Sequence, residues 1–219
     1  MAVRRVSPGA RPAAVLGLTV VAAVLFAAVF RFGPPGRLDF FALFSIAAGL
    51  ASGSAFAVDT DYAGRLAADL RSGLPGKAAA GLASAAVLYG LFAVGRALSR
   101  LLLPFAAAEI GRVYALKSGV PAVRIVLLVG LVIGPAEEIF WRGFVQERMA
   151  GMTGRTRGLL LTSLLYAAVH VASGNVMLVL AAAVCGLFWG SLYLRFRSPV
   201  LNVVSHTIWD LAVLVIFPF

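Results

Sequence analysis

Charged residues are scarce in this chain, and their scarcity argues against a water-soluble fold. Only 13% of the 219 residues are Asp, Glu, Lys or Arg, against roughly 25% in an average soluble domain. Hydrophobic residues make up 61% of the chain, and several uncharged runs approach the roughly 20 residues that a helix needs to cross a bilayer. The sequence therefore predicts an integral membrane protein.

Acidic residues are especially few. The chain has 9 Asp and Glu against 19 Lys and Arg, so its formal net charge is +10. The cations are scattered between apolar runs and do not form the dense cluster with aromatic residues that is typical of a nucleic-acid surface. We interpret them as anchors beside anionic lipid, and we expect a bilayer rather than a nucleic acid as the partner.

Other absences narrow the choice further. Cys185 is the only cysteine, which excludes an internal disulfide, and its apolar neighbours indicate a small buried thiol. The chain has two histidines and no H-E-x-x-H spacing. Because no repeat or low-complexity linker interrupts residues 1–219, we expect a single membrane domain.

Apolar length predicts an all-α bundle of about seven or eight membrane-spanning helices. The stretch 99–118 is ambiguous because Pro104, Glu109 and Arg112 interrupt its apolar residues, so it fits an interfacial helix or a dipping segment. The seven clear runs are 12–30, 40–58, 78–95, 125–141, 158–173, 176–194 and 199–217.

We expect the protein to lie in the cell (plasma) membrane, and the distribution of cations between the loops predicts the orientation of its spans. With the N-terminus inside, the inner loops carry Arg4, Arg5, Arg11, Arg65, Arg71, Lys77, Arg148, Arg155, Arg157, Arg195 and Arg197. The outer loops carry the smaller set of Arg31, Arg37, Arg96, Arg100, Arg112, Lys117 and Arg124.

The last third of the chain keeps charged side chains where they are costly. A charge at bilayer depth costs roughly 2.5 to 3.5 kcal/mol on insertion scales, so a span that keeps several of them indicates function. Two histidines accompany these charges. The set is Glu137, Glu138, Arg142, His170, His206 and Asp210.

Helical spacing sorts these residues into partners, because residues four apart lie on one face. Glu138 and Arg142 form one such pair, and a buried ion pair of this kind is more often structural than catalytic. His206 and Asp210 form another, in which the carboxylate could orient the imidazole. Glu137 points about 100° away from Glu138 and has no cation on its own helix face, which suits a general base.

Simpler interpretations exist for single residues. A lone histidine in a membrane helix is often only a hydrogen-bonded contact. Tyr166 shares a face with His170 and could merely fill space with its hydroxyl on a neighbour. We assign Asn175 to loop capping, and we assign Trp141, Trp189 and Trp209 mostly to packing and interface anchoring.

Taken in order, these residues resemble the three motifs of the CPBP family of intramembrane peptidases, named for CAAX prenyl endopeptidases and bacteriocin-processing proteins. The motifs are Glu137-Glu138-x-x-x-Arg142, Tyr166-x-x-x-His170 and His206-x-x-x-Asp210. The resemblance covers roughly residues 121–217, which we predict to be the catalytic core.

The resemblance implies a bundle of about eight helices, with an additional helix around Leu101, and glutamate-dependent hydrolysis of a peptide bond without a cofactor. It implies that Glu137 and His170 activate the attacking water and that His206 and Asp210 stabilise the oxyanion. Glu138 and Arg142 would hold the site together. The implied partner is a protein or peptide substrate that enters from the membrane.

Two positions depart from the family pattern. Tyr166 stands where phenylalanine is usual, a change that we expect to be tolerated. Asp210 stands where the third motif often has asparagine, and an ionised aspartate cannot donate a hydrogen bond to an oxyanion. Asp210 is therefore either protonated or acts by orienting His206.

Three other functions stay open. A metallopeptidase would use Glu137, His170, His206 and Asp210 as ligands of a divalent metal, since imidazoles and carboxylates are normal zinc donors. An ion-coupled transporter would also place such residues in helices, although no matched halves are visible. A non-catalytic immunity or scaffold protein could keep the fold and the site without turnover.

Overall fold

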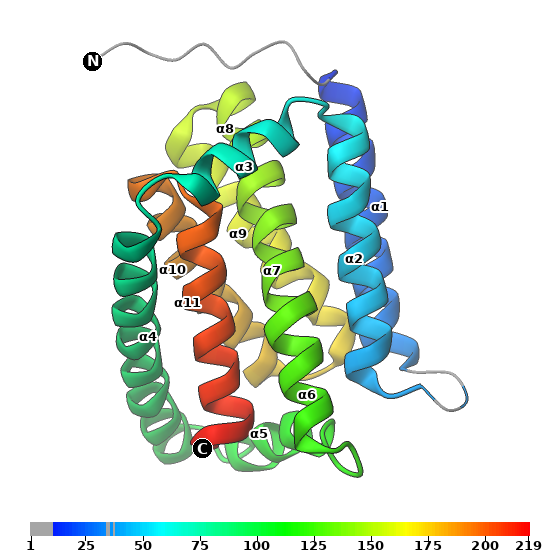
Figure 1. The fold of residues 1–219 in the computed structure, drawn as a ribbon. Coiled ribbons are helices and arrows are strands. Elements are labelled where there is room, and N and C mark those ends of the chain that lie inside the picture. Colours follow the sequence, from blue (N-terminus) through cyan, green and yellow to red (C-terminus); the bar gives the residue numbers. More distant parts are fainter. Residues whose placement is uncertain (1–10, 34–35, 37) are drawn as a thin grey trace.

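The computed structural model describes residues 11–33, 36 and 38–219, and these residues form helices and no β-strand. The helices pack side by side into one bundle (Figure 1). Its long helices are α1 (Pro12–Phe32), α2 (Phe40–Val58), α4 (Leu74–Leu102), α9 (Arg155–His170), α10 (Val176–Phe196) and α11 (Pro199–Leu211).

One further helical path runs without interruption from Ala122 to Thr153 along the middle of the bundle (Figure 1). Pro135 lies within it and has no N–H, which removes one α-helical hydrogen bond and favours a widened turn. The path consists of α6 (Ala122–Leu128), the π-helical η1 (Val129–Ile133), α7 (Gly134–Glu137), the π-helical η2 (Glu138–Gln146) and α8 (Glu147–Thr153).

The prediction of an all-α membrane bundle is confirmed. Five described helices are long and apolar enough to cross a membrane, namely α1, α2, α4, α10 and α11 with its π-helical continuation η4 (Ala212–Ile216). The path from α6 to α8 and the 16-residue α9 also run along the bundle (Figure 1). Together they correspond to the seven predicted runs.

The ambiguous stretch does not contain an eighth spanning helix. It forms the end of α4 and then α5 (Ala106–Ala115), which has 10 residues and lies at one end of the bundle (Figure 1). At about 1.5 Å per residue, α5 extends only about 15 Å, half of the hydrocarbon thickness. The interfacial-helix alternative is the one that agrees with the structure.

At the opposite end, α3 (Tyr62–Arg71) occupies a stretch that we predicted to be an inner loop. The search for apolar runs missed α3 because it is amphipathic and only Tyr62 is buried. The Tyr62 hydroxyl donates to the carbonyl of Ile139 at 2.6 Å. This bond ties α3 to η2, beside the predicted site.

A second polar tie fastens the same end. Asp59 follows α2, is fully buried and forms ion pairs with Arg65 of α3 and Arg148 of α8. Burial alone would raise the pKa of Asp59, but hydrogen bonds and charge from the two arginines outweigh it and lower the pKa. The carboxylate therefore stays ionised and joins three helices.

Aromatic packing positions the segment that carries the glutamates. Phe26 of α1 lies 5.2 Å from Phe44 of α2 and 5.9 Å from Trp141 of η2, measured between ring centroids. Phe140 and Trp141 are fully buried. Buried aromatic pairs of this kind stabilise a fold by more than the burial of their area alone. The packing against α1 and α2 therefore holds η2 in position.

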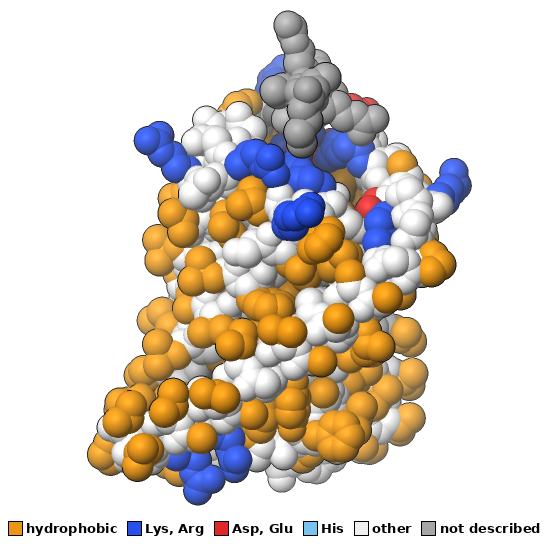
Figure 2. All heavy atoms as spheres, turned by 90° about the vertical axis from the view of Figure 1, so that its left-hand side faces the viewer, with side chains coloured by type: hydrophobic (Ala, Val, Ile, Leu, Met, Phe, Trp, Pro, Cys, Tyr) orange, Lys and Arg blue, Asp and Glu red, His pale blue; other side chains and the backbone are white. Residues whose placement is uncertain are grey.

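The outer surface fits a bilayer. Figure 2 shows hydrophobic side chains along the length of one face and Lys and Arg side chains towards its two ends. Many large apolar residues are exposed along the spans, including Val21 at 65% and Leu131 at 71%. Of the cations used to predict orientation, Arg4, Arg5 and Arg37 lie outside the described residues.

Candidate active site

The six predicted charged and histidine residues come from three neighbouring segments. Glu137 ends α7 and Glu138 begins η2, His170 ends α9, and His206 lies in α11. Five of them are almost inaccessible, with exposures of 5% for Glu137, 0% for Glu138, 1% for Arg142, 7% for His170 and 3% for His206. The polar groups are therefore held inside the bundle, where each needs a partner.

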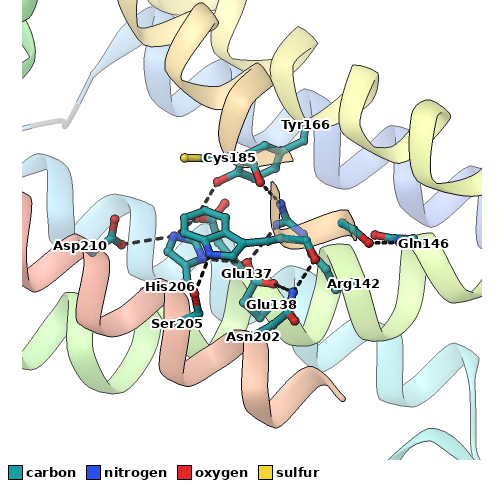
Figure 3. Close-up of polar contacts among 12 residues, drawn as sticks. Glu137, Glu138, Arg142, Gln146, Tyr166, Cys185, Asn202, Ser205, His206 and Asp210 are labelled. Carbon is teal, nitrogen blue, oxygen red and sulfur yellow. Dashed lines mark hydrogen bonds and ion pairs between the residues drawn. The ribbon is translucent and has the colours of Figure 1, made fainter. Parts of the chain in front are cut away.

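Glu138 is the centre of the hydrogen-bond network (Figure 3). Its Oε1 accepts from Arg142 Nη1 at 3.0 Å and from His206 Nδ1 at 2.7 Å. Its Oε2 accepts from Asn202 Nδ2 at 3.1 Å. The predicted pair of Glu138 and Arg142 is present, and both carboxylate oxygens are occupied by contacts within the protein.

His206 joins the first and third motifs. Its Nδ1 donates to Glu138, so its Nε2 is the nitrogen that faces the remaining acidic groups. Nε2 lies 3.3 Å from Asp210 Oδ2 and 3.8 Å from Glu137 Oε2. The predicted contact of His206 with Asp210 is present, but the group that orients the ring through Nδ1 is Glu138, which we did not predict.

The partners of Glu137 differ from those of its neighbour. Its Oε2 accepts a long hydrogen bond of 3.4 Å from the Tyr166 hydroxyl and lies 3.8 Å from His206 Nε2. Tyr166 thus places its hydroxyl on a neighbouring side chain, as its simpler interpretation predicted. Of the two carboxylates, Glu137 has the longer contacts, so it is the one that can exchange a protein contact for a water molecule.

His170 stands apart from the charged network. Its Nδ1 donates to the carbonyl of Tyr166 at 2.7 Å, so in the neutral ring Nε2 is the acceptor. The ring packs at 4.8 Å from Phe30 and 5.1 Å from Tyr166, measured between centroids. Among the described residues no hydrogen bond joins His170 directly to Glu137, and Tyr166 is the residue that contacts both.

Two site residues escaped the sequence reasoning. Asn202 donates to Glu138 and to the carbonyl of Trp189 at 2.8 Å. Trp189 stacks on His206 with a centroid distance of 3.7 Å and an interplanar angle of 23°. Asn202 precedes His206 by four residues, so helical spacing could have identified it. Nothing in the sequence distinguished Trp189 from a packing residue.

The four residues considered as metal ligands are not assembled as a set. Across the described part of the chain, no group of three or more His, Cys, Asp and Glu is arranged to hold a metal ion. Glu137 and Asp210 face His206 Nε2, whereas His170 contacts Tyr166 and Phe30. A divalent ion bound by Glu137, Asp210 and His206 would supply a Lewis acid, but the arrangement described does not fit it without side-chain movement.

Comparison with known families agrees with the motifs. Residues 119–212 match the family model described as type II CAAX prenyl endopeptidase Rce1-like. The family resemblance is confirmed for this segment, which contains every residue of the three motifs. Comparisons with curated proteins and with solved structures found no match. The family match supports an intramembrane endopeptidase in general.

Proposed function

Since residues 119–212 match the Rce1-like family of CAAX endopeptidases, we propose that this protein hydrolyses a peptide bond inside the membrane by means of glutamate and histidine side chains. The observation that carries the proposal is the difference in hydrogen bonding between the neighbouring carboxylates Glu137 and Glu138. Glu138 is fully engaged by Arg142, Asn202 and His206. Glu137 has only long contacts, so its carboxylate is the one free to accept a proton from a water molecule.

In the proposed reaction Glu137 is the general base. Its carboxylate takes a proton from water while the water oxygen attacks the carbonyl carbon of the substrate. Nε2 of His170 is the acceptor nitrogen of that ring and is assigned to the same water, as the family resemblance implies. The proton held by Glu137 then passes to the amine nitrogen as the C–N bond breaks, which restores the carboxylate.

His206 is assigned to the oxyanion. Its Nδ1 is fixed on Glu138, its ring is stacked on Trp189, and Asp210 lies at Nε2. In the protonated imidazole the single Nε2–H lies against Asp210, and in the proposed reaction it is shared between Asp210 and the negative oxygen of the tetrahedral intermediate. Glu138 and Arg142 hold this ring in position rather than reacting.

The substrate is proposed to be a membrane-associated or secreted protein that reaches the site from the bilayer. The family description names a prenylated CAAX end, so a prenylated CAAX peptide is the first substrate to test. An unprenylated peptide with the same residues separates recognition of the peptide from recognition of the lipid.

The proposal is tested by comparing two adjacent amide substitutions in purified protein. Glu137→Gln removes the base but keeps size, so we expect cleavage to fall by a factor of about a hundred or more, the scale of a lost general base, with an unchanged melting temperature. Glu138→Gln leaves Arg142 and His206 without their acceptor. We expect a lower yield of folded protein and a lower melting temperature, because breaking a buried ion pair costs about 3 to 5 kcal/mol.

Cleavage is measured by mass spectrometry of the peptide products and folding by thermal unfolding in detergent. If Glu137→Gln protein cleaves as fast as the normal chain, Glu137 is not the base. If the normal chain cleaves neither peptide, precursor termini that accumulate in cells carrying Glu137→Gln would reveal its substrates. Equal proteomes in the two cell lines would favour the non-catalytic alternative.

A further inference from the structure

A cationic pocket lies at the end of the bundle where α4 and α5 meet. Its cavity has a volume of about 450 Å³. Arg96 and Arg100 come from α4, and Tyr114 comes from α5. Lys117 follows α5, and Phe219 closes one wall. None of the residues of the proposed active site lines this pocket.

The ionisable side chains that line the pocket carry positive charge. Three of its nine lining residues are cations, and none is Asp or Glu. Within the described residues, Arg96, Arg100 and Lys117 form no ion pair, although Lys117 Nζ donates to the carbonyl of Leu214 at 2.8 Å. Basic groups at one concave site attract an anion with several acceptor oxygens.

Several cations at the opposite end of the bundle are paired with acids. Arg65 pairs with Asp59, Lys77 with Asp69, and Arg197 with Glu147. These ion pairs connect helices, and the two charges in each pair neutralise each other. No acidic side chain lines the pocket with Arg96, Arg100 and Lys117, so their charge is available for a ligand.

Exposed apolar side chains follow or precede the lining residues in the sequence. Leu101 is 79% exposed and Leu102 is 69% exposed at the end of α4, and Phe217 is 64% exposed near Phe219. These side chains require hydrocarbon rather than water around them. A ligand that suits both features is an amphiphile. Its anionic group would contact Arg96 and Arg100, and its hydrocarbon chains would lie along Leu101 and Leu102.

Aromatic rings lie beside two of the cations that line the cavity. The guanidinium of Arg96 lies 5.9 Å from the ring centroid of Phe219, and Lys117 Nζ lies 4.8 Å from that of Tyr114. The Tyr114 hydroxyl donates to the carbonyl of Val213 at 3.0 Å, which fastens α5 to η4. The cations are therefore held against rings in a fixed wall, in the interfacial zone where tyrosine and arginine are favoured.

From this combination we propose that the pocket binds the phosphate of an anionic phospholipid, with Arg96, Arg100 and Lys117 as its cationic contacts. The acyl chains lie against Leu101 and Leu102. The site fixes the position of α5, and through Tyr114 and Lys117 that of η4, relative to the bilayer surface.

The test measures lipid binding to purified protein in a neutral detergent by native mass spectrometry. The probes are dioleoyl phosphatidylglycerol, dioleoyl phosphatidylcholine and inorganic phosphate. We expect phosphatidylglycerol to bind at least about tenfold more tightly than phosphatidylcholine. Removing two cations with Arg96→Gln and Arg100→Gln should weaken phosphatidylglycerol about 25-fold, because each basic residue near an anionic lipid contributes about fivefold, or about 1 kcal/mol.

The matched control removes two exposed arginines from the other end, Arg157→Gln and Arg195→Gln, and should leave the affinity unchanged. Equal affinity for the two lipids, or an equal loss in the control, would overturn the proposal. If inorganic phosphate binds as tightly as phosphatidylglycerol, the pocket is a site for a soluble phosphate and the lipid assignment is wrong. Thermal unfolding of each variant without lipid verifies that the fold is intact.

Discussion

His206 is the side chain on which the proposed chemistry converges. One nitrogen of its ring is used for positioning, since Nδ1 donates to Glu138 at 2.7 Å. The other faces Asp210 and Glu137 at 3.3 and 3.8 Å. When His206 is protonated, it and Arg142 are two cations beside three carboxylates. One carboxylate therefore lacks a cation of its own, and the one with the longest contacts is best suited to exchange a proton. That acid is Glu137.

Asp210 occupies the position where the family often has asparagine, and two substitutions separate its possible roles. Asp210→Asn keeps the shape and adds a donor, so we expect substantial activity. Asp210→Ala removes the contact with His206 Nε2 and should lower the cleavage rate by a factor of about a hundred or more, the size typical of one lost oxyanion contact. The measurement is the initial rate of peptide cleavage.

The pattern of the two rates identifies the role. An alanine variant as fast as the normal chain would reduce Asp210 to a packing residue. If asparagine is as damaging as alanine, the negative charge itself is required, which favours charge stabilisation of His206 or metal ligation over direct donation.

The glutamic and metal-dependent mechanisms make opposite predictions for chelation. If Glu137 and His170 activate water without an ion, purified protein should keep its cleavage rate after exhaustive chelation and should contain no stoichiometric metal. Rate and metal content are measured on the same preparation. If chelation abolishes activity and one divalent ion restores it, Glu137, His206 and Asp210 are metal ligands instead.

At the scale of elements, close helix packing depends on small residues. Gly158 of α9 faces α8 so closely that an added Cβ would lie 2.5 Å from the backbone nitrogen of Ala150 and 2.6 Å from its Cα. Because the obstacle is backbone, Gly158→Ala must push the helices apart, and we expect a loss of about 1 to 3 kcal/mol of stability. Thermal unfolding in detergent measures it.

Gly90 of α4 provides the matched control. An added Cβ there meets nothing within 4 Å, so Gly90→Ala should be neutral or should stabilise by up to about 1 kcal/mol through helix propensity. Equal melting temperatures for the two variants would contradict the assigned packing of α8 against α9.

The sequence was sufficient for the elements that the bilayer itself dictates. Long apolar runs predicted the seven helical segments that run along the bundle, five of which are long and apolar enough to cross a membrane, because a span must be both helical and apolar. The ten-residue helices α3 and α5 follow no such rule. Residues four apart identified the pairs Glu138–Arg142 and His206–Asp210, but the contact between His206 and Glu138 joins positions 68 residues apart. It depends on how two helices pack, which spacing within one helix cannot reveal.

At the scale of the whole molecule, the bundle has two chemically different ends. The end that contains α3 and α8 carries many cations, some of them paired with acids, and lies beside the described start of α1 (Figure 1). The end that contains α5 carries the cationic pocket. The excess of Lys and Arg at the first end predicts that it faces the cytoplasm, since cytoplasmic loops carry more of these residues.

This orientation is testable with one cysteine at each end. Thr156 and Ser118 are exposed at opposite ends, and the native Cys185 is buried. In intact cells a membrane-impermeant maleimide should label Ser118→Cys, whereas Thr156→Cys should react only after permeabilisation. The unsubstituted chain controls for reaction at Cys185. The reverse pattern would mean that the modest excess of cations does not set the orientation and that the pocket beneath α5 faces the cytoplasmic leaflet.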